Sequence, residues 1–502
     1  MASNEVLLGP ATDDPPIEPT PTRPKSRLAV WSWMLFDWAT QPFSTLILTF
    51  VFGPYLTSRA LTNESAHEFL ATIGLGFMVD PAAATNDAGG QTVWALTAAV
   101  VGIVTALLSP VFGAMADATG PRKPWIAAFS VLAVLGSLGL WVLEPNAATG
   151  TIALALMFYA IAFFGFEFAT VFNNAMMPDL VPRSELGRLS GNAWALGYVG
   201  GLVSLVIVLG LMSADPNSGR TLIGTEPILG LDPGMAEGDR AAGPLTALWY
   251  AVFVLPLFLF VPDTARRVAT RGAITKVLRE LRHTIRTLPQ QRSLFAYLGS
   301  SMLYRDALNG LYTFGGVYAA GVLGWSIILI GVFGILAALI GAVGAYVGGF
   351  IDKWLGPKTV VAGSIVALML VTITVIATTP ETVLFLPVGG GIVPDVTVDL
   401  PLLGTLRTPD LVFFGCGCVI GAAGGALQAA SRTLLVDQAD PARMTEAFGL
   451  YALSGKATSF LAPALVAVFT AAFASQRAGV VPLVALFAAG LVLLPLVRGR
   501  GR

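Results

Sequence analysis

The stretch Gly113-Ala-Met-Ala-Asp117-Ala-Thr-Gly120-Pro121-Arg122-Lys123 follows one long apolar segment, and Gly348-Gly-Phe-Ile-Asp352-Lys-Trp-Leu-Gly356-Pro357-Lys358 follows another. In both stretches a glycine lies four residues before an aspartate, and a Gly-Pro turn with a basic residue comes next. Glycines allow helices to approach and the chain to reverse, while an aspartate can pair with a base or cap a neighbouring helix end. The recurrence predicts a chain made of two similar halves.

Outside these two stretches the chain is dominated by apolar runs. Of its 502 residues, 55% are hydrophobic and only 12% charged, whereas soluble domains carry roughly 25% charge. Runs of about 20 apolar residues can cross the hydrocarbon core of a bilayer. Such runs lie near residues 29–57, 92–116, 124–143, 151–177, 191–213 and 244–262, and then near 293–320, 325–351, 359–379, 409–433, 447–474 and 480–497. This pattern predicts an all-α polytopic membrane protein with twelve transmembrane helices in two pseudo-symmetric six-helix bundles.

The polar segments define the expected domains and the orientation. We predict a disordered tail at 1–28, bundles at 29–262 and 293–497, a basic linker at 263–292 and a short tail at 498–502. With both termini in the cytoplasm, most of the 29 Lys and Arg residues lie on the cytoplasmic side, as the positive-inside rule requires. The spacing of apolar residues in the linker predicts an amphipathic helix at the membrane surface, which either binds anionic head groups or only follows the charge rule.

The motif after the second span resembles G-x-x-x-D-x-x-G-x-R-K of the major facilitator superfamily, with a degraded copy after the eighth span. Four further stretches resemble the vacuole-effluxer branch, which contains autophagy-related amino-acid effluxers and many bacterial members. They are Trp33-Met-Leu-Phe-Asp37-Trp38-Ala39, Asn174-Ala-Met-Met-Pro178-Asp179-Leu180, Gly187-Arg188-Leu-Ser190-Gly191-Asn-Ala-Trp194-Ala-Leu-Gly197-Tyr198 and Phe448-Gly449-Leu-Tyr451-Ala-Leu-Ser454-Gly455-Lys456. The resemblance covers nearly all of residues 29–497. It implies a secondary transporter that exports a small solute, with amino acids as the expected class.

The resemblance also implies where the gates and the central site lie. Gate residues at the cytoplasmic side are expected to be Asp117, Arg122, Asp352, Lys358 and Arg432. Asp117 and Asp352 are alternatively turn caps, and Arg432 alternatively reaches the interface from the end of its helix. The first and seventh helices are expected to line a central cavity from opposite bundles.

Ionisable residues inside the spans are the best candidates for the transport mechanism, because each costs roughly 2.5–3.5 kcal/mol to insert unless it faces a cavity or a partner. Five such residues are present: Asp37, Glu167, Arg305, Asp306 and Lys456. Several of them share a helix face with further polar residues. The predicted substrate-binding residues are Asp37, Gln41, Asn174, Tyr198, Arg305, Asn309 and Lys456, and the predicted proton-coupling residues are Asp37, Glu167 and Asp306.

A charge count sharpens this prediction. Three carboxylates (Asp37, Glu167 and Asp306) oppose two bases (Arg305 and Lys456), so one carboxylate lacks a full partner. Desolvation would favour its protonated form and make it a proton carrier. The alternatives are a static ion network and a site that binds a charged substrate without protons. An amino acid suits this site because it offers a carboxylate to a base and an ammonium to a carboxylate.

Other functional classes find less support. His67 and His283 are the only histidines, both in predicted loops, and no metalloprotease or serine-hydrolase motif is present, so we expect no enzyme. The i, i+2 spacing of Cys416 and Cys418 argues against a disulfide and a metal site, and we expect no cofactor. The net charge of −1 argues against nucleic acid as a partner. We expect a monomer in the bacterial cytoplasmic membrane, with a membrane sensor or a carrier of lipid-like cargo as alternatives.

Overall fold

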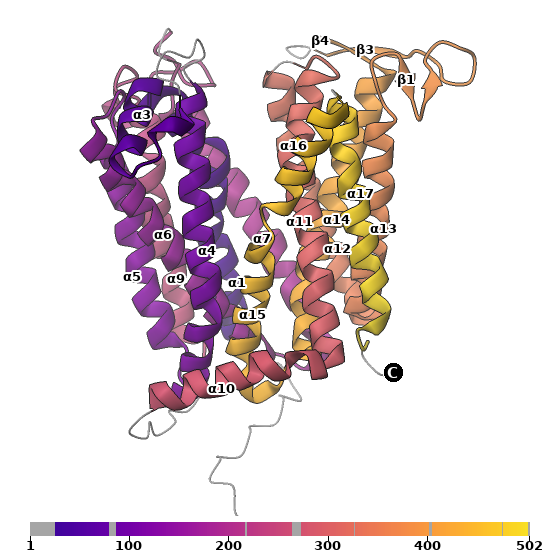
Figure 1. Cartoon of the computed structure of the whole chain (residues 1–502). Coiled ribbons are helices and arrows are strands. Elements are labelled where there is room, and N and C mark those ends of the chain that lie inside the picture. Colours follow the sequence, from indigo (N-terminus) through magenta and orange to yellow (C-terminus); the bar gives the residue numbers. More distant parts are fainter. Residues whose placement is uncertain are drawn as a thin grey trace, which may run out of the picture.

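Helices make up most of the computed structural model, which describes residues 26–79, 87–215, 218–263, 273–325, 327–400, 404–473 and 475–499. They stand side by side in two bundles, one from each half of the sequence (Figure 1). The predicted all-α membrane fold with two bundles is confirmed. Most of the predicted tails at 1–28 and 498–502 lies outside the described residues.

The first bundle contains the long helices of the first six spans and several short turns between them. These elements are α1 (Arg27–Pro42), η1 (Phe43–Phe50), α2 (Phe52–Tyr55), η2 (Leu56–Ala60), α3 (Asn63–Thr72), η3 (Gly76–Met78), α4 (Asp87–Thr119), α5 (Lys123–Gly139), η4 (Leu140–Val142), α6 (Thr149–Met176), η5 (Met177–Asp179), η6 (Arg183–Glu185), α7 (Leu186–Ile207), η7 (Val208–Met212), η8 (Ile228–Gly230), α8 (Glu237–Arg240) and α9 (Ala242–Phe260).

The second bundle follows a helix, α10, that lies across one end of the molecule (Figure 1). Its elements are α10 (Ala273–Thr287), η9 (Leu288–Gln290), α11 (Arg292–Gly321), α12 (Ile327–Leu355), α13 (Pro357–Ile376), β1 (Thr382–Val383), β2 (Leu386–Pro387), β3 (Thr397–Leu400), β4 (Gly404–Arg407), α14 (Thr408–Gln438), η10 (Pro441–Arg443), α15 (Met444–Ala457), α16 (Leu461–Phe473), α17 (Gln476–Leu493) and η11 (Leu494–Leu496).

Ten helical segments among the described residues are long and apolar enough to cross a membrane. The two predicted spans outside this set are the first, which corresponds to α1 and η1, and the seventh, which corresponds to α11. Both carry charged residues within the helix, Asp37 in α1 and the pair Arg305 and Asp306 in α11. The spans that are least apolar are therefore the two that were expected to line a central cavity.

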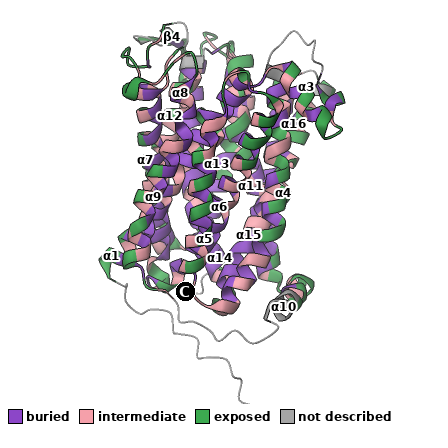
Figure 2. Cartoon of the chain, turned by 90° about the vertical axis from the view of Figure 1, so that its left-hand side faces the viewer, coloured by how far each residue is buried: buried purple, intermediate pink, exposed green. Residues whose placement is uncertain are grey.

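The long helices expose apolar side chains and bury their polar ones, as expected for helices surrounded by lipid. On α4, Val100, Ile103 and Leu107 are exposed, while Thr105 and Ser109 are buried and donate to carbonyl oxygens of their own helix. Residues coloured as exposed likewise lie on the outer faces of the bundles (Figure 2). Apolar side chains outside and satisfied hydroxyls inside are what a lipid-facing helix requires.

Glycines bring helices of the two halves into contact near α10. Gly113 of α4 lies against the backbone of Thr445 in α15, and Gly449 of α15 lies against Ser109 of α4. A Cβ at either glycine would collide with backbone atoms of the opposite half. The glycine of the first motif is therefore required by close packing between the two halves.

Two of the expected continuous spans are interrupted. Pro42 ends the regular part of the first span, and the next eight residues, η1, form a π-helix. The eleventh span, predicted as one run at 447–474, breaks between α15 and α16. Interruptions of this kind free backbone groups and often occur at functional sites.

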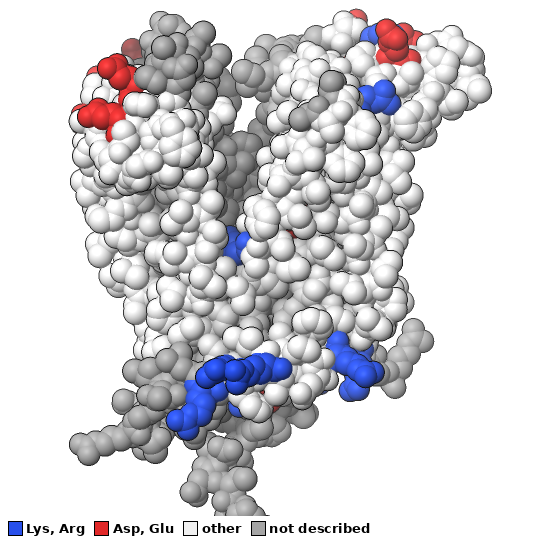
Figure 3. Space-filling view, viewed as in Figure 1, with Lys and Arg blue, Asp and Glu red and all other residues white. Residues whose placement is uncertain are grey.

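The two ends of the molecule differ. We call the end that carries α10 the α10 end, and the opposite end, with the antiparallel pairs β1–β2 and β3–β4, the hairpin end (Figure 1). At the α10 end, Leu281 of α10 packs on Ala114 of α4, and Arg443 donates to Thr284 at 2.8 Å. Toward the hairpin end the molecule is hollowed between its halves, and one patch of Lys or Arg atoms is visible in the hollow (Figure 3). The hollow leads toward the middle of the fold.

Candidate functional site

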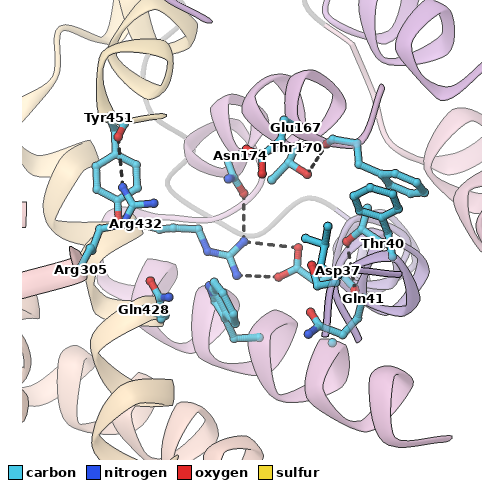
Figure 4. Close-up of a pocket in the computed structure, with 16 residues that line it drawn as sticks. Asp37, Thr40, Gln41, Glu167, Thr170, Asn174, Arg305, Gln428, Arg432 and Tyr451 are labelled. Carbon is cyan, nitrogen blue, oxygen red and sulfur yellow. Dashed lines mark hydrogen bonds and ion pairs between the residues drawn. The ribbon is translucent and has the colours of Figure 1, made fainter. Parts of the chain in front are cut away.

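A cavity of about 240 Å³ lies between the two halves. Figure 4 shows the side chains that line it. They are Asp37, Thr40, Gln41, Phe43, Ser44, Leu48, Phe166, Glu167, Thr170, Asn174, Trp194 and Gly197 from the first half, and Arg305, Gln428, Arg432 and Tyr451 from the second. Both halves thus contribute charged and polar groups to one space.

Arg432 of α14 reaches across the cavity to the first half (Figure 4). Its guanidinium lies 2.5 and 3.4 Å from the two carboxylate oxygens of Asp37 and donates to Asn174 at 2.9 Å. It also lies over the ring of Trp194, 5.1 Å from the centroid. Because α14 continues to Gln438, Arg432 lies six residues before the end of the helix. Its side chain is part of the cavity lining.

Lys456 forms a second ion pair between the halves. Its Nζ lies 3.1 Å from a carboxylate oxygen of Glu167 on α6 and 4.8 Å from the ring centroid of Phe163. The side chains of Lys456 and Glu167 are 27% and 31% exposed. This pair is therefore open to solute and water.

Arg305 of α11 lies in the cavity wall without a carboxylate. Its guanidinium stacks on the ring of Tyr451 at 4.2 Å from the centroid and donates to the Tyr451 carbonyl at 3.1 Å. Within the part of the chain that the structure describes, no carboxylate lies within ion-pair distance of Arg305. Gly455 lies against it, and a Cβ there would collide with the guanidinium.

Asp306, the neighbour of Arg305, points to a different place. One of its carboxylate oxygens accepts a hydrogen bond from the backbone N–H of Ala462 at 3.0 Å, and the residue is 1% exposed. Its other oxygen has no hydrogen-bond partner among the described residues. Asp306 thus caps the start of α16 at the break in the eleventh span and does not line the cavity.

These positions change the charge count made from the sequence. Asp306 leaves the set and Arg432 joins it. Arg305 and Arg432 line the cavity, and Lys456 is not part of the lining but pairs with Glu167, which is. Three bases therefore oppose two carboxylates, Asp37 and Glu167. With all five groups ionised, the sum is +1 instead of −1. The two carboxylates are each paired with a base, and the unpaired group is a cation.

The other predicted binding residues are divided between cavity and surroundings. Gln41 and Asn174 line the cavity. Asn309 is exposed and is not part of the lining. Tyr198 lies beside Gly341 of the opposite half, where a Cβ would stand 3.4 Å from the tyrosine ring.

The sequence interpretation missed Gln428, Tyr451 and Trp194 as cavity residues. Gln428 lies four residues before Arg432 on α14, so the two share a helix face. The polar-face criterion used for the other spans would have identified Gln428 as a cavity residue. Tyr451 stands five residues before Lys456, and its role depends on the stacking of Arg305, which no periodicity reveals.

Both motif aspartates lie at contacts between the halves at the α10 end. Asp117 accepts hydrogen bonds from the backbone N–H groups of Thr445 and Glu446 at 3.2 and 2.8 Å, at the start of α15. Arg122 pairs with Asp179 at 2.6 Å and donates to the Thr445 hydroxyl at 3.1 Å. The first motif therefore binds the N-terminus of a helix from the other half, where a negative charge is favourable.

The second motif makes a related contact. Asp352 accepts from the Thr433 hydroxyl at 2.5 Å and lies against Gly187 at the start of α7, where a Cβ would collide with the carboxylate. Lys353 pairs with Glu185 just before α7. Lys358 instead donates to the Val497 carbonyl at 2.6 Å, within its own half. These bonds close the α10 end beneath the cavity.

No group of three or more His, Cys, Asp or Glu residues in the described part of the chain is arranged to hold a metal ion.

Comparisons with known proteins agree with this architecture. A family model described as "Vacuole effluxer Atg22 like" matches residues 25–501. The chain is 24% identical over 467 residues to YxiO of Bacillus subtilis (strain 168), an uncharacterized MFS-type transporter, and the match covers 93% of this chain and 94% of that protein.

Solved structures show the same fold. The human organic anion transporter MFSD10 (TETRAN) superposes with a TM-score of 0.61 at 16% identity, covering 94% of this chain and 100% of that one. The proton:xylose symporter XylE, bound to 6-bromo-6-deoxy-D-glucose, gives a TM-score of 0.62 at 12% identity, covering 94% and 95%. With the family model spanning nearly all of its length, the chain belongs to the Atg22-like vacuole effluxer family and is a secondary transporter of the major facilitator superfamily.

Proposed function

We propose that this transporter carries a small polar solute, an amino acid or a similar carboxylate-bearing compound, by alternating access to the cavity between Asp37 and Arg305. The observation that supports this most is that charged groups from both halves meet in a cavity that is closed toward the α10 end. Its volume of about 240 Å³ lies below the roughly 300–1,000 Å³ typical of pockets for drug-sized ligands. A compact solute therefore fits the site better than a lipid-like one.

The orientation follows from charge. Arg279, Arg282 and Arg286 are exposed on α10, so the positive-inside rule assigns the α10 end to the cytoplasm. On this assignment the conformation is outward-facing, and the motif contacts at Asp117 and Asp352 form the closed cytoplasmic gate. Export then requires that these contacts open so that cytoplasmic solute reaches the same cavity.

Proton coupling fits Glu167 best among the predicted carboxylates. Glu167 is partly exposed in the cavity and bonded to a single lysine, whereas Asp37 is held by Arg432 and Asn174. Protonation of Glu167 would release Lys456 and loosen one of the two ion pairs that join the halves at the cavity. Binding of a proton to Glu167 would thereby favour separation of the two halves at the site.

A reconstituted transport assay tests this proposal. Purified protein in liposomes receives a pool of amino acids and small metabolites under an imposed pH gradient, and mass spectrometry identifies accumulated solutes. We expect accumulation that depends on the pH gradient and is lost in Glu167→Gln. Asp306→Asn serves as the matched carboxylate outside the cavity and should retain coupling if its folding is preserved.

Two results would contradict parts of the proposal. If no solute moves in folded wild-type protein, a small polar cargo is wrong. If a solute moves equally with and without the gradient, and Glu167→Gln behaves like the wild type, the transport is not proton-coupled through this carboxylate.

A further inference from the structure

Arg305 differs from the other two bases of the site. Arg432 and Lys456 each hold a carboxylate of the opposite half, at 2.5 and 3.1 Å. Arg305 holds none among the described residues, although it lines the cavity together with Arg432, Asp37 and Glu167. Of these three bases, only Arg305 has no carboxylate partner among the described residues, so its charge is available to a bound solute.

The guanidinium is also fixed in place. Its central carbon lies over the Tyr451 ring, one of its N–H groups donates to the Tyr451 carbonyl, and Gly455 lies directly against it. A guanidinium has five N–H donors, so most remain for a ligand. A planar donor set held in one orientation matches the two oxygens of a carboxylate, which it can bind through two parallel hydrogen bonds.

The carboxylates of the site are not equally available. Asp37 is held by Arg432, and Glu167 by Lys456, so a solute ammonium would have to displace a base to reach either of them. A solute carboxylate displaces nothing at Arg305. A solute with one negative charge also brings the sum of the site from +1 to zero, which favours its transfer into a partly dehydrated cavity.

We propose that Arg305 forms a carboxylate-binding subsite, and that recognition depends on the solute's carboxylate while its ammonium is dispensable. This rests on the proposed transport function and defines its substrate class: small organic anions with a single carboxylate, including N-blocked amino acids. Gln41, Thr170 and Gln428 offer neutral hydrogen-bonding groups elsewhere in the cavity for the rest of such a solute.

Four forms of one amino acid allow the contributions of the carboxylate and the ammonium to be measured separately. The free amino acid, its N-acetyl derivative, its amide and its N-acetyl amide share a side chain and carry net charges of 0, −1, +1 and 0. A small, a branched apolar and an amide side chain are used in turn. Binding is read from the fluorescence of the purified protein, since Trp194 lines the cavity, and transport from uptake into liposomes.

We expect both acids to bind about tenfold or more tightly than their amides, the contrast that follows from losing a charge-assisted bidentate contact. N-acetylation of the acid should weaken binding by less than about threefold, or strengthen it, because no free carboxylate awaits the ammonium. Equal affinities for acids and amides, or strict dependence on the ammonium, would overturn the subsite.

Variants locate the effect. Arg305→Gln should bring acids and amides to similar affinity while neutral N-acetyl amides still bind, and Arg305→Lys should keep a reduced preference for acids. Arg407→Gln, at an exposed arginine paired with Asp395 in the β-hairpins, is the control and should match the wild type. An unchanged preference in folded Arg305→Gln contradicts the assignment.

The outcome also separates this inference from the transport function itself. If the wild type transports neutral or cationic members of the set as well as the anions, the protein is a transporter and the carboxylate subsite is wrong. If none of the forms binds or moves, the subsite is overturned. The pooled metabolite assay then decides independently whether the protein transports another class of solute.

Discussion

Two of the ion pairs that join the halves lie at the cavity, and they differ in depth and surroundings. Arg432 and Asp37 have side chains only 5% and 13% exposed, with Asn174 and Trp194 as further partners of the guanidinium. The Lys456–Glu167 pair makes a single contact and is about one third exposed. On α6, Asn174 and Glu167 lie seven residues apart, which is about 10 Å along the helix. The shielded pair therefore lies nearer the closed α10 end.

The difference indicates that the two ion pairs have different roles within one site. Removing one member of a buried pair leaves a charge without compensation, whereas an exposed pair can exchange its partner for water or a ligand at little cost. Arg432 and Asp37 are thus suited to hold the outward-facing conformation together. Lys456 and Glu167 are suited to respond to solute and protons.

Breaking the shielded pair should have the largest effect. Arg432→Gln or Asp37→Asn alone should destabilise the protein by about 3–5 kcal/mol and abolish transport, because each leaves a buried charge unpaired. The double variant should lose less than the sum of the two. Thermal unfolding in detergent, arranged as a double-mutant cycle, measures this coupling, and additive effects would remove the distinction between the two pairs.

Loosening the gate beneath the shielded pair should have an intermediate effect. Asp117→Asn removes the negative charge at the N-terminus of α15, which is worth about 1 kcal/mol and hence a roughly fivefold shift toward the open gate. Ser190 bonds to the Ala429 carbonyl across the halves, so Ser190→Cys, with both native cysteines replaced, reports access from the α10 end. Its labelling rate should rise about fivefold.

The control for this measurement is Asp395→Asn, which alters a carboxylate at the hairpin end. It should leave the labelling of the cysteine at position 190 unchanged. Equal labelling with and without Asp117→Asn would mean that the charge at α15 does not hold the gate.

Neutralising the exposed pair should have the smallest effect on stability. Lys456→Gln and Glu167→Gln should each change the free energy of unfolding by less than about 1 kcal/mol. Their coupling should decrease as salt rises from 0.05 to about 0.5 M, since exposed charges are screened. A coupling as large and as salt-independent as that of Arg432 and Asp37 would show that the two pairs are equivalent.

The fold was largely predictable because its signals are repeated and long. Apolar runs marked the ten helical segments that are long and apolar enough to cross a membrane among the described residues, and the motif at Asp117 and Asp352 related the halves. The break between α15 and α16 was missed because the apolar runs on its two sides were joined into one span, although the polar stretch Ser454-Gly-Lys-Ala-Thr-Ser459 lies at the break. The hairpins β1 to β4 were also missed, because their strands are two to four residues long.

The site was predictable only in part. Polar residues within spans identified Asp37, Glu167 and Arg305 as cavity residues, whereas Asp306, which was counted with them, caps α16 outside the cavity. Arg432 was assigned to a gate because the end of the tenth span was placed five residues too early. The sign of the charge in the cavity depends on that one residue and on the rotation of α11, which hydropathy does not define.

The surplus cation in the cavity has an electrical consequence. Across a membrane, moving one elementary charge through the full potential is worth about 2.3 kcal/mol per 100 mV. An empty site of charge +1 would be drawn toward the negative side, whereas a site that holds a monovalent anion is neutral and insensitive to voltage. Membrane potential would thus act on the return of the unloaded carrier rather than on the step that moves its cargo.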